Sequence, residues 1–515
     1  MVPAPDKRAQ LMPVVVRGAS LSAVGLIAQQ GITMAAYIVL ARLASPSTFG
    51  AFAAAAIVVS TGGFLAESGM AAALIQRSGP IEAAAATATA STLVGGVLLS
   101  LLALALAPVV GLFFQSSEIG QVSAALSGLL FLNAAAVVPG ALLQRRLSFR
   151  PLLISEPLSA LTLGVAGGLA LAAGLGVWGL AIGAYASAVV RTVSIWVTGR
   201  WFPRFAGASW AVWRELASFA RHVLASEAIR NSGSIVTTAV IGRVLGTAPL
   251  GQFRYAWRIV GAGSSVVGVG SYVLFPVFSQ IADQPERFRS AVERSVRVSA
   301  LALFPISFLF LSLGNPLVVL VFGRTWSEAG WVLVALSAVP AAAALGSVSS
   351  EALKAAGRPD LLPVSHLLGA GLPIALMFPL LRFGAVGVGL AFSIGVGITG
   401  LYILLRVASV VGTPARVILK PLIVPAVAGG IAAGLVFALD QLVVDAGGRT
   451  ALVGLALLGL ETLVGALAYV SLATAFSRQA AFELRAIRDF IVARVRGSGS
   501  GANDSETRAE TRRSV

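Results

Sequence analysis

Four ionisable residues form two pairs at helical spacing inside apolar segments of the chain. Glu227 and Arg230 are three residues apart and Arg254 and Arg258 are four apart, so each pair would share one face of a helix. A charge at the middle of a membrane helix costs about 2.5–3.5 kcal/mol on insertion scales, which makes such residues functional candidates. The planar donor fork of arginine suits phosphate oxygens. The pattern therefore predicts a cationic cavity built from these segments.

Each of these residues also has a purely structural interpretation. Arg230 would then pair with Glu227, and Arg254 would extend towards the outer membrane interface. In the first half of the chain, Glu67 would either bind a proton or sodium ion, or form an ion pair with a basic neighbour such as Arg191. Glu227 is a second, weaker candidate for ion coupling.

The elements that must position these residues are apolar stretches of membrane-spanning length. The chain has 515 residues, of which 57% are hydrophobic and 11% charged, with a mean hydropathy of +0.90. Soluble domains carry about 25% charged residues, and a spanning helix needs about 20 apolar ones. We predict an all-α membrane protein with about 14 transmembrane helices. Their ranges are 18–40, 49–75, 85–107, 119–143, 152–174, 177–198, 218–245, 249–281, 295–313, 328–350, 361–381, 384–405, 421–440 and 450–473.

The basic residues follow these stretches with a strong bias. If the N-terminus is inside, the inner segments hold 27 of the 37 Lys and Arg residues and the outer segments hold 5. Cytoplasmic loops of membrane proteins collect Lys and Arg. The bias predicts a multi-pass membrane protein with both termini in the cytoplasm.

Composition also argues against several classes of site. A net charge of +16 would suggest nucleic-acid binding in a soluble protein, but here it is spread over short loops and is explained by topology. The chain has no cysteine, and its two histidines, His222 and His366, are far apart in sequence. We therefore expect no metal site and no cofactor, and only a proton or sodium ion is a candidate for coupling.

Two segments of the chain repeat at a constant offset of 201 residues. Leu40–Phe52 aligns with Ile241–Phe253, so that Arg42, Gly50 and Phe52 match Arg243, Gly251 and Phe253. A looser pair is 141–153 with 351–362. Because the offset equals six predicted spans, the two halves should run parallel and enclose a central cavity, as transporter repeats do.

The repeat predicts the domain organisation. Two six-helix lobes would be followed by two extra helices and a tail, whose basic amphipathic start would lie on the membrane before disorder sets in. The predicted ranges are 1–17 for the N-terminus, 18–217 for the N-lobe, 218–415 for the C-lobe, 416–477 for the extra helices and 478–515 for the tail.

Three segments together resemble a known family. These are VLARLASPSTFGAFAAAAIVVSTGGFLAESGMAAALIQR (39–77), ALLQRRLSFRPLLISEPLSALTLGVAGGLALAAGLGVWGLAIG (141–183) and EALKAAGRPDLLPVSHLLGAGLPIALMFPLLRFGAVGVGLAFSI (351–394). They resemble bacterial polysaccharide-export flippases of the Wzx type, within the multidrug/oligosaccharidyl-lipid/polysaccharide (MOP) exporter superfamily. The likeness covers about residues 12–475.

The resemblance implies a function and roles for individual residues. Such a flippase moves a lipid-linked oligosaccharide from the inner to the outer leaflet, without hydrolysing ATP, for polysaccharide biosynthesis. Arg230, Arg254 and Arg258 would bind its diphosphate, while Gln29, Gln30 and Asn133 would contact sugar hydroxyls. The expected partners are this substrate, membrane lipids and the polymerase or glycosyltransferases of the same pathway.

Three other functions compete with this prediction. A cation-coupled drug exporter of the same superfamily should have an acidic, aromatic-lined cavity, whereas the charges within these spans are mostly arginine. A membrane glycosyltransferase or polymerase would need larger outer loops, so we expect no enzyme. A lipid II flippase has a similar fold, and the sequence separates it poorly from a polysaccharide flippase.

Overall fold

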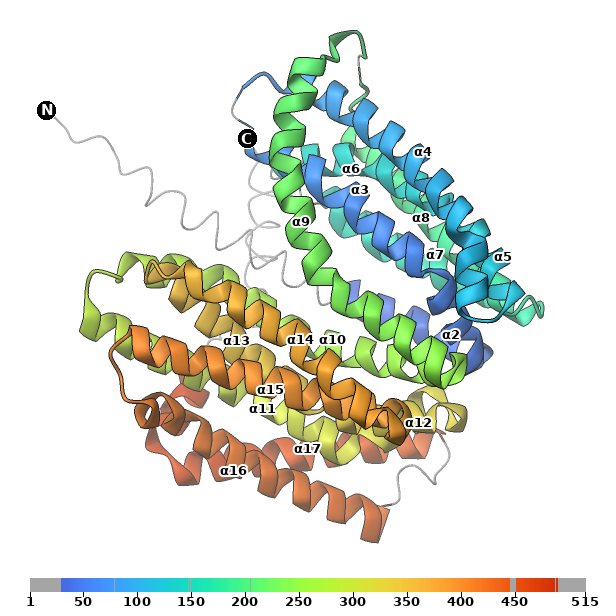
Figure 1. Cartoon of the computed structure of the whole chain (residues 1–515). Coiled ribbons are helices and arrows are strands. Elements are labelled where there is room, and N and C mark those ends of the chain that lie inside the picture. The colour runs from blue at the N-terminus through green and yellow to red at the C-terminus, as the bar shows by residue number, and fades with distance from the viewer. Residues whose placement is uncertain are drawn as a thin grey trace, which may run out of the picture. The chain divides into compact units, whose positions relative to one another are not determined.

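The computed structural model describes residues 29–444 and 451–489, apart from 78, 147, 149, 204 and 487. Within helices, it leaves out the side chains of 64–68, 150, 152, 206, 222, 225, 226, 229, 230, 265–273, 443, 444 and 451. In the described residues every regular element is a helix and no strand occurs, so the prediction of an all-α protein is confirmed (Figure 1). The predicted N-terminus (1–17) and the predicted disorder near the C-terminus lie outside the described residues.

The first half of the chain forms a helix at Gln29–Leu43 followed by a series of helices. These are α2 (Pro46–Ala55), α3 (Ile57–Gln76), α4 (Ile81–Phe113), α5 (Ser117–Leu126), α6 (Leu129–Arg145), α7 (Arg150–Ala172), α8 (Val177–Gly199) and α9 (Trp210–Val240), which a π-helical turn (Ile241–Leu245) extends.

The second half continues in the same way. Its helices are α10 (Thr247–Gln280), α11 (Pro285–Phe322), α12 (Ser327–Ala335), α13 (Ala338–Ala355), α14 (Leu362–Leu380), α15 (Gly384–Val410), α16 (Ala415–Leu439) and α17 (Ala451–Phe476). Each predicted apolar stretch overlaps one of these helices or a pair separated by one or two residues. Hydropathy therefore located the helices.

The described helices make the chain a multi-pass membrane protein. Eight helices are long and apolar enough to cross a membrane, or up to ten if two bent pairs each count as one span. This count treats residues 359–410 as one run. However, Gly384 has a φ of +65°, and a side chain at Gly387 would overlap the carbonyl of Leu380, so the chain turns back between α14 and α15. The figure of 14 spans and the two-lobe plan stay predictions.

The chain divides into two compact units. Unit 1 comprises Met1–Ala262, Val318–Val332 and His366–Phe392, and unit 2 comprises the rest. Unit 1 thus holds the first half of the chain, including α9. It also holds the ends of α10, α11, α12, α14 and α15 that we predict to lie on the outer side. The first part of α10, up to Ala262, therefore packs with the helices of the first half of the chain.

Within unit 1, α2 and α10 touch through the two glycines of the sequence repeat. A side chain at Gly50 would overlap the carbonyl of Thr247, and one at Gly251 would overlap the carbonyl of Pro46. Pro46 and Thr247 are themselves separated by 201 residues, so the contact is reciprocal. Only glycine lets two helix backbones approach this closely.

The start of α2 is fixed by its own sequence. Ser45 caps the helix by accepting a hydrogen bond from the Thr48 amide at 3.2 Å, and Pro46 occupies the first turn. The crossing with α10 therefore falls in the first turns of both helices, next to the predicted outer membrane face.

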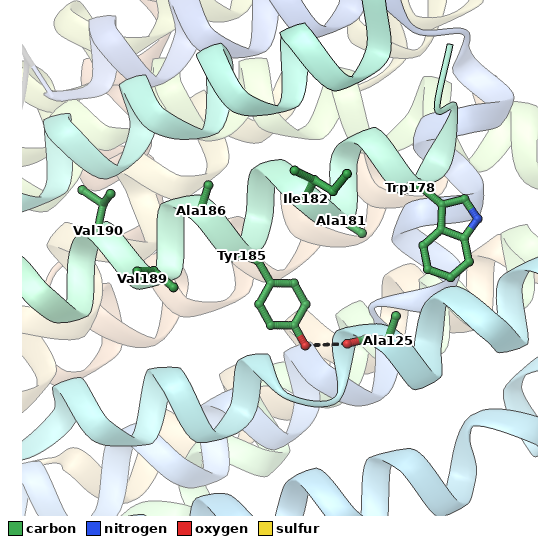
Figure 2. Close-up of a pocket in the computed structure, with 8 residues that line it drawn as sticks. All are labelled: Ala125, Trp178, Ala181, Ile182, Tyr185, Ala186, Val189 and Val190. Atoms are coloured by element: carbon green, nitrogen blue, oxygen red, sulfur yellow. Dashed lines mark hydrogen bonds between the residues drawn. The ribbon is translucent and has the colours of Figure 1, made fainter. Parts of the chain in front are cut away.

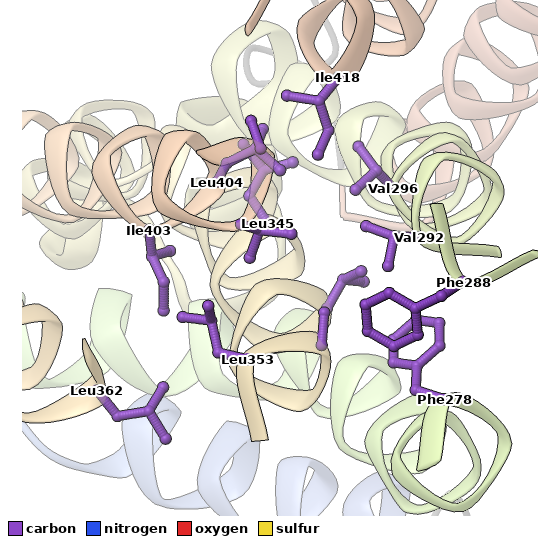
Figure 3. Close-up of a cluster of buried hydrophobic side chains, with 14 residues drawn as sticks. Phe278, Phe288, Val292, Val296, Leu345, Leu353, Leu362, Ile403, Leu404 and Ile418 are labelled. Atoms are coloured by element: carbon purple, nitrogen blue, oxygen red, sulfur yellow. The ribbon is translucent and has the colours of Figure 1, made fainter. Parts of the chain in front are cut away.

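Unit 2 has its largest described core where α11, α13, α15 and α16 meet the end of α10 (Figure 3). Phe278 and Phe288 stack edge to face there, with ring centroids 5.7 Å apart. Leu353 is 0% exposed within the same cluster. This core fixes the end of the bundle that we predict to be cytoplasmic.

The start of the predicted tail is helical and packs against unit 2. Residues 478–486 form helix. Glu483 is buried and accepts two hydrogen bonds from Arg294 of α11, at 2.9 and 3.0 Å. Phe482 is 64% exposed. One face of this segment is thus held to the protein, while an apolar side chain is left available for the membrane surface.

Replacing Leu353 with alanine should destabilise the protein by about 3 kcal/mol, because it leaves a cavity in a closed core. The measurement is the apparent melting temperature of the purified protein in detergent. Leu367→Ala is the matched control, since Leu367 is 71% exposed. Equal melting temperatures for the two variants would contradict the assignment of this core.

Candidate functional site

A small pocket in unit 1 lies where α2, α3, α9 and α10 meet, and one arginine lines it. Its volume is about 80 Å³. The lining residues are Ala53, Ala56, Ile57, Ser60, Asn231, Ser234, Ile235, Thr238 and Arg254. The apolar wall consists of Ala53, Ala56 and Ile57, with Ser60 of α3 beside them. The polar wall comes from α9 and α10 and includes one apolar residue, Ile235.

Arg254 provides the charge of this pocket. Its guanidinium donates to the Ser234 hydroxyl at 3.2 Å, which is its one hydrogen bond among the described residues. The Thr238 hydroxyl donates a hydrogen bond to the Ser234 backbone carbonyl at 2.8 Å. A guanidinium carries five N–H donors. Arg254 is therefore left with donors that an anion could accept from.

Arg258 lies one turn further along the same helix. Its guanidinium carbon stands 3.4 Å from the centroid of the Tyr37 ring, a close cation–π contact. Two like charges four residues apart on a helix repel each other. A bound dianion would relieve this repulsion, so the pair favours an anionic ligand with charge on more than one oxygen.

An aromatic cluster surrounds Tyr255, the residue that follows Arg254 on α10. Tyr255, which is 3% exposed, packs its ring against those of Phe49, Phe322 and Trp326, with centroids 4.9, 5.2 and 4.2 Å away. Its hydroxyl donates to the Tyr37 carbonyl at 2.6 Å. The cluster joins four separate helical segments of unit 1 into one apolar block.

Two hydrogen-bonded contacts join the helices of this aromatic cluster further. The Arg42 guanidinium donates to the carbonyls of Leu320 and Val321, the last turn of α11. Cations at a helix C-terminus satisfy its free carbonyls. The indole of Trp326, which is 0% exposed, donates to the Ala41 carbonyl at 3.0 Å. The end of the first helix is thus tied to the end of α11.

The structure bears differently on each predicted charged residue. It places Arg254 in the pocket and Arg258 beside Tyr37 on the same helix. The side chains of Arg230 and Glu67 lie outside the described residues. Glu227 is half-buried and accepts a hydrogen bond from the Asn231 amide at 3.2 Å. The predicted diphosphate contacts of the three arginines stay predictions.

Arg191 forms an ion pair within the first half of the chain. Its Nε lies 2.9 Å from Oε1 of Glu156, which joins α8 to α7. The pairing with Glu67 that we expected as one alternative lies outside the described side chains. Arg191 is not among the lining residues of the Arg254 pocket, and its part in ion coupling stays a prediction.

The predicted sugar contacts lie apart from this pocket. Gln29 and Gln30 begin the first described helix, and Asn133 lies on α6; all three are half-buried. None of them lines either described pocket. Their contact with a sugar stays a prediction.

The sequence analysis missed the polar stripe of α9. Asn231, Ser234 and Thr238 all line the pocket, and their spacing of three and four residues continues the face of Glu227. A search for polar residues at helical spacing within this weakly apolar span would have found them. Ser60 of α3 carries no such signal, because no polar residue follows it three or four positions later.

A second, larger pocket offers no comparable chemistry (Figure 2). It has a volume of about 610 Å³ and lies along α8, with Ala125 of α5 at its edge. Trp178, Ile182 and Val189 line it and are exposed. The Tyr185 hydroxyl already donates a hydrogen bond to the Ala125 carbonyl, at 2.5 Å. The groove carries no charge and fits the lipid-facing surface of a membrane protein.

Comparison with known proteins supports the resemblance in sequence. A family model described as "Polysaccharide biosynthesis protein" matches residues 39–330. This range contains the whole Arg254 pocket, the glycine contact and the aromatic cluster.

Two relatives and one solved structure extend this match. The succinoglycan biosynthesis transport protein ExoT of Rhizobium meliloti is 31% identical over 58% of this chain and 61% of its own length. The lipopolysaccharide biosynthesis protein WzxC of Escherichia coli is 25% identical over 73% and 77%. The lipid II flippase MurJ, in an inward closed conformation, is similar in fold, with a TM-score of 0.72 at 15% identity, over 89% of this chain and 99% of MurJ. The match to ExoT thus spans less than two thirds of that relative.

Proposed function

This chain belongs to the family of polysaccharide biosynthesis proteins, and we propose that it is a flippase that moves a lipid-linked oligosaccharide from the inner to the outer leaflet of the bacterial plasma membrane. The observation that carries the proposal is Arg254, an arginine at membrane depth with unused donors in a pocket between the two sequence repeats. The relatives named for glycan biosynthesis and transport support the same substrate class.

The chemistry of the pocket matches the common part of such substrates. A polyprenyl diphosphate carries negative charge on several oxygens between an apolar tail and a polar sugar. Arg254 and Arg258 would take the diphosphate, and the hydroxyls and amide of the α9 stripe would accept and donate hydrogen bonds to the first sugar. The lipid tail would stay in the bilayer.

The size of the pocket implies movement. Ligand pockets for drug-sized molecules measure about 300–1,000 Å³, whereas this one measures about 80 Å³. The closed end formed by the glycine contact, the aromatic cluster and Arg42 lies on the predicted outer side. Alternating access would open the inner side for loading and then separate this outer block for release.

The charges of the site disfavour the drug-exporter alternative. Arg254 and Arg258 would repel an organic cation. Glu227, the carboxylate on α9 nearest in sequence to the pocket residues, accepts a hydrogen bond from Asn231. Lipid II also carries a diphosphate, so the described site fits it equally well. The two flippase substrates must be separated by experiment.

Deleting the gene in its native host should cause lipid-linked oligosaccharide to accumulate on the inner leaflet, because the later assembly steps act on the outer side. The measurement is extraction of the lipid fraction with analysis of its diphosphate-linked sugars, before and after the full chain is restored. Accumulation of the peptidoglycan precursor instead would reassign the protein to lipid II, and an unchanged lipid fraction would contradict the flippase proposal.

A further inference from the structure

Glu461 is a fully buried acid in the part of the chain that the proposed function does not use. It lies on α17, ten residues from the start of that helix, and is 0% exposed. Both of its carboxylate oxygens are buried and have no hydrogen-bond partner among the described residues. Helices α16 and α17, which run side by side at the end of the chain, hold it within the apolar part of the bundle (Figure 1).

Residues on the same face of α17 as Glu461 show which helices this face contacts. Gly465 and Tyr469 follow at four-residue intervals on this face. A side chain at Gly465 would overlap Val436 of α16, and the Tyr469 hydroxyl donates to the Leu301 carbonyl of α11 at 3.1 Å. The carboxyl of Glu461 therefore lies on the side of α17 that packs on α16 and α11.

The helices that face Glu461 bring no positive charge to it. On α16 the basic residues are Arg416 and Lys420, five or more turns from the α17 end of the hairpin, and on α11 no charged residue follows Arg297. Among the described residues, the charged group that acts on Glu461 is another acid, Asp440, which is 4% exposed. Arg449, in the loop between the two helices, lies outside the described residues.

An ionised carboxylate cannot persist in such a place. Burying a charge without hydrogen bonds or a partner of opposite sign costs several kcal/mol, and a neighbouring carboxylate adds to that cost. Hard metal cations usually require six or more oxygen ligands, and Glu461 offers two. A proton is the ligand that removes the charge without needing further ligands.

We propose that Glu461 is a proton-binding site of the α16–α17 hairpin. The charge of Asp440 would favour the protonated form of Glu461. The site is separate from the Arg254 pocket and its existence does not depend on the glycan that is transported. Gain or loss of the proton would change the charge at the contact of α17 with α16 and α11. A proton gradient could therefore change how these helices pack.

Carbodiimide labelling of the full-length protein in native membranes tests this proposal. Dicyclohexylcarbodiimide enters apolar regions and modifies carboxyl groups that carry a proton, and the chain has no cysteine to compete. Mass spectrometry should find Glu461 modified at neutral pH and progressively less modified as the pH is raised. Glu156, which is paired with Arg191, is the matched control and should stay unmodified.

Two variants and a sodium-protection experiment complete this test. Asp440→Asn should move the pH of half-maximal labelling down by about one unit, because the repulsion that favours the proton is gone. Glu461→Gln should remove the label at normal protein level. Labelling of Glu461 that does not change with pH, or its absence at every pH, would overturn the proposal. Protection by sodium at constant pH would also overturn it, in favour of a sodium site.

Discussion

Replacing Arg254 with alanine should reduce export about 10- to 150-fold at a normal level of membrane protein. The variant removes the one described charge of the pocket, and hydrogen bonds to charged groups contribute about 1.5–3 kcal/mol each. Arg254→Lys should retain part of the activity, because it keeps the charge but loses the planar fork of donors. The measurement is accumulation of lipid-linked sugar on the inner leaflet together with immunoblotting of the protein.

The chain provides a control for the loss of charge alone. Arg243→Ala removes an arginine that is exposed near the outer end of α9, away from the lining of the pocket. It should leave export close to normal. If Arg254→Ala exported normally as well, the anion-binding assignment of the pocket would fail while the fold and the family would stand.

Replacing Gly50 with alanine should push the α2–α10 crossing apart and favour a state that is open to the outside. The methyl group would overlap a backbone carbonyl of α10, which cannot rotate away as a side chain can. Overpacking of this kind costs about 3 kcal/mol, and such a shift changes the ratio of two states about 100-fold. Export should fall, because the return to the closed outer side becomes unfavourable.

Cysteine accessibility measures this shift directly, since the chain has no cysteine of its own. An Ala56→Cys reporter in the pocket should react with a membrane-impermeant maleimide from outside faster in the Gly50→Ala background than in the parent. Gly251→Ala should give the same result, because the contact is reciprocal.

The controls separate opening from misfolding. Gly95→Ala should change neither labelling nor export, because nothing lies within 4 Å of its added methyl group. The double variant Gly50→Ala with Gly251→Ala should not add the two effects, since each single change already breaks the same contact. Unchanged labelling in both single variants would show that the crossing does not close the outer side.

The helices were predictable because the signal for them is local. Apolar length marks each helix, and the four-residue spacing places Arg254 and Arg258 on one face of α10 without knowledge of any neighbour. The ion pair of Arg191 was not predictable. Its described partner, Glu156, is 35 residues away on another helix, and several acids were equally available to it.

The sequence repeat shows the same limit. An offset of 201 residues indicates that Gly50 and Gly251 are equivalent, but equivalence does not imply contact. Only the packing of α2 on α10 brings the two positions together. The aromatic cluster was likewise hidden, because Tyr37, Phe49, Phe322 and Trp326 come from separate segments and none stands out from the many aromatic residues of the chain.

The glycine contact places the local symmetry axis of the repeat beside the pocket, and this has a consequence for how many ligands the chain can hold. Ala53 and Ile57, which line the apolar wall, stand 201 residues before Arg254 and Arg258. The fold therefore offers two equivalent positions for a pair of cations, and the sequence fills one of them. A charged group entering the pocket meets a positive side and a neutral side, so it can bind in a single orientation. The flippase that we propose would thus carry one lipid per cycle, always with the same face of its diphosphate turned towards α10.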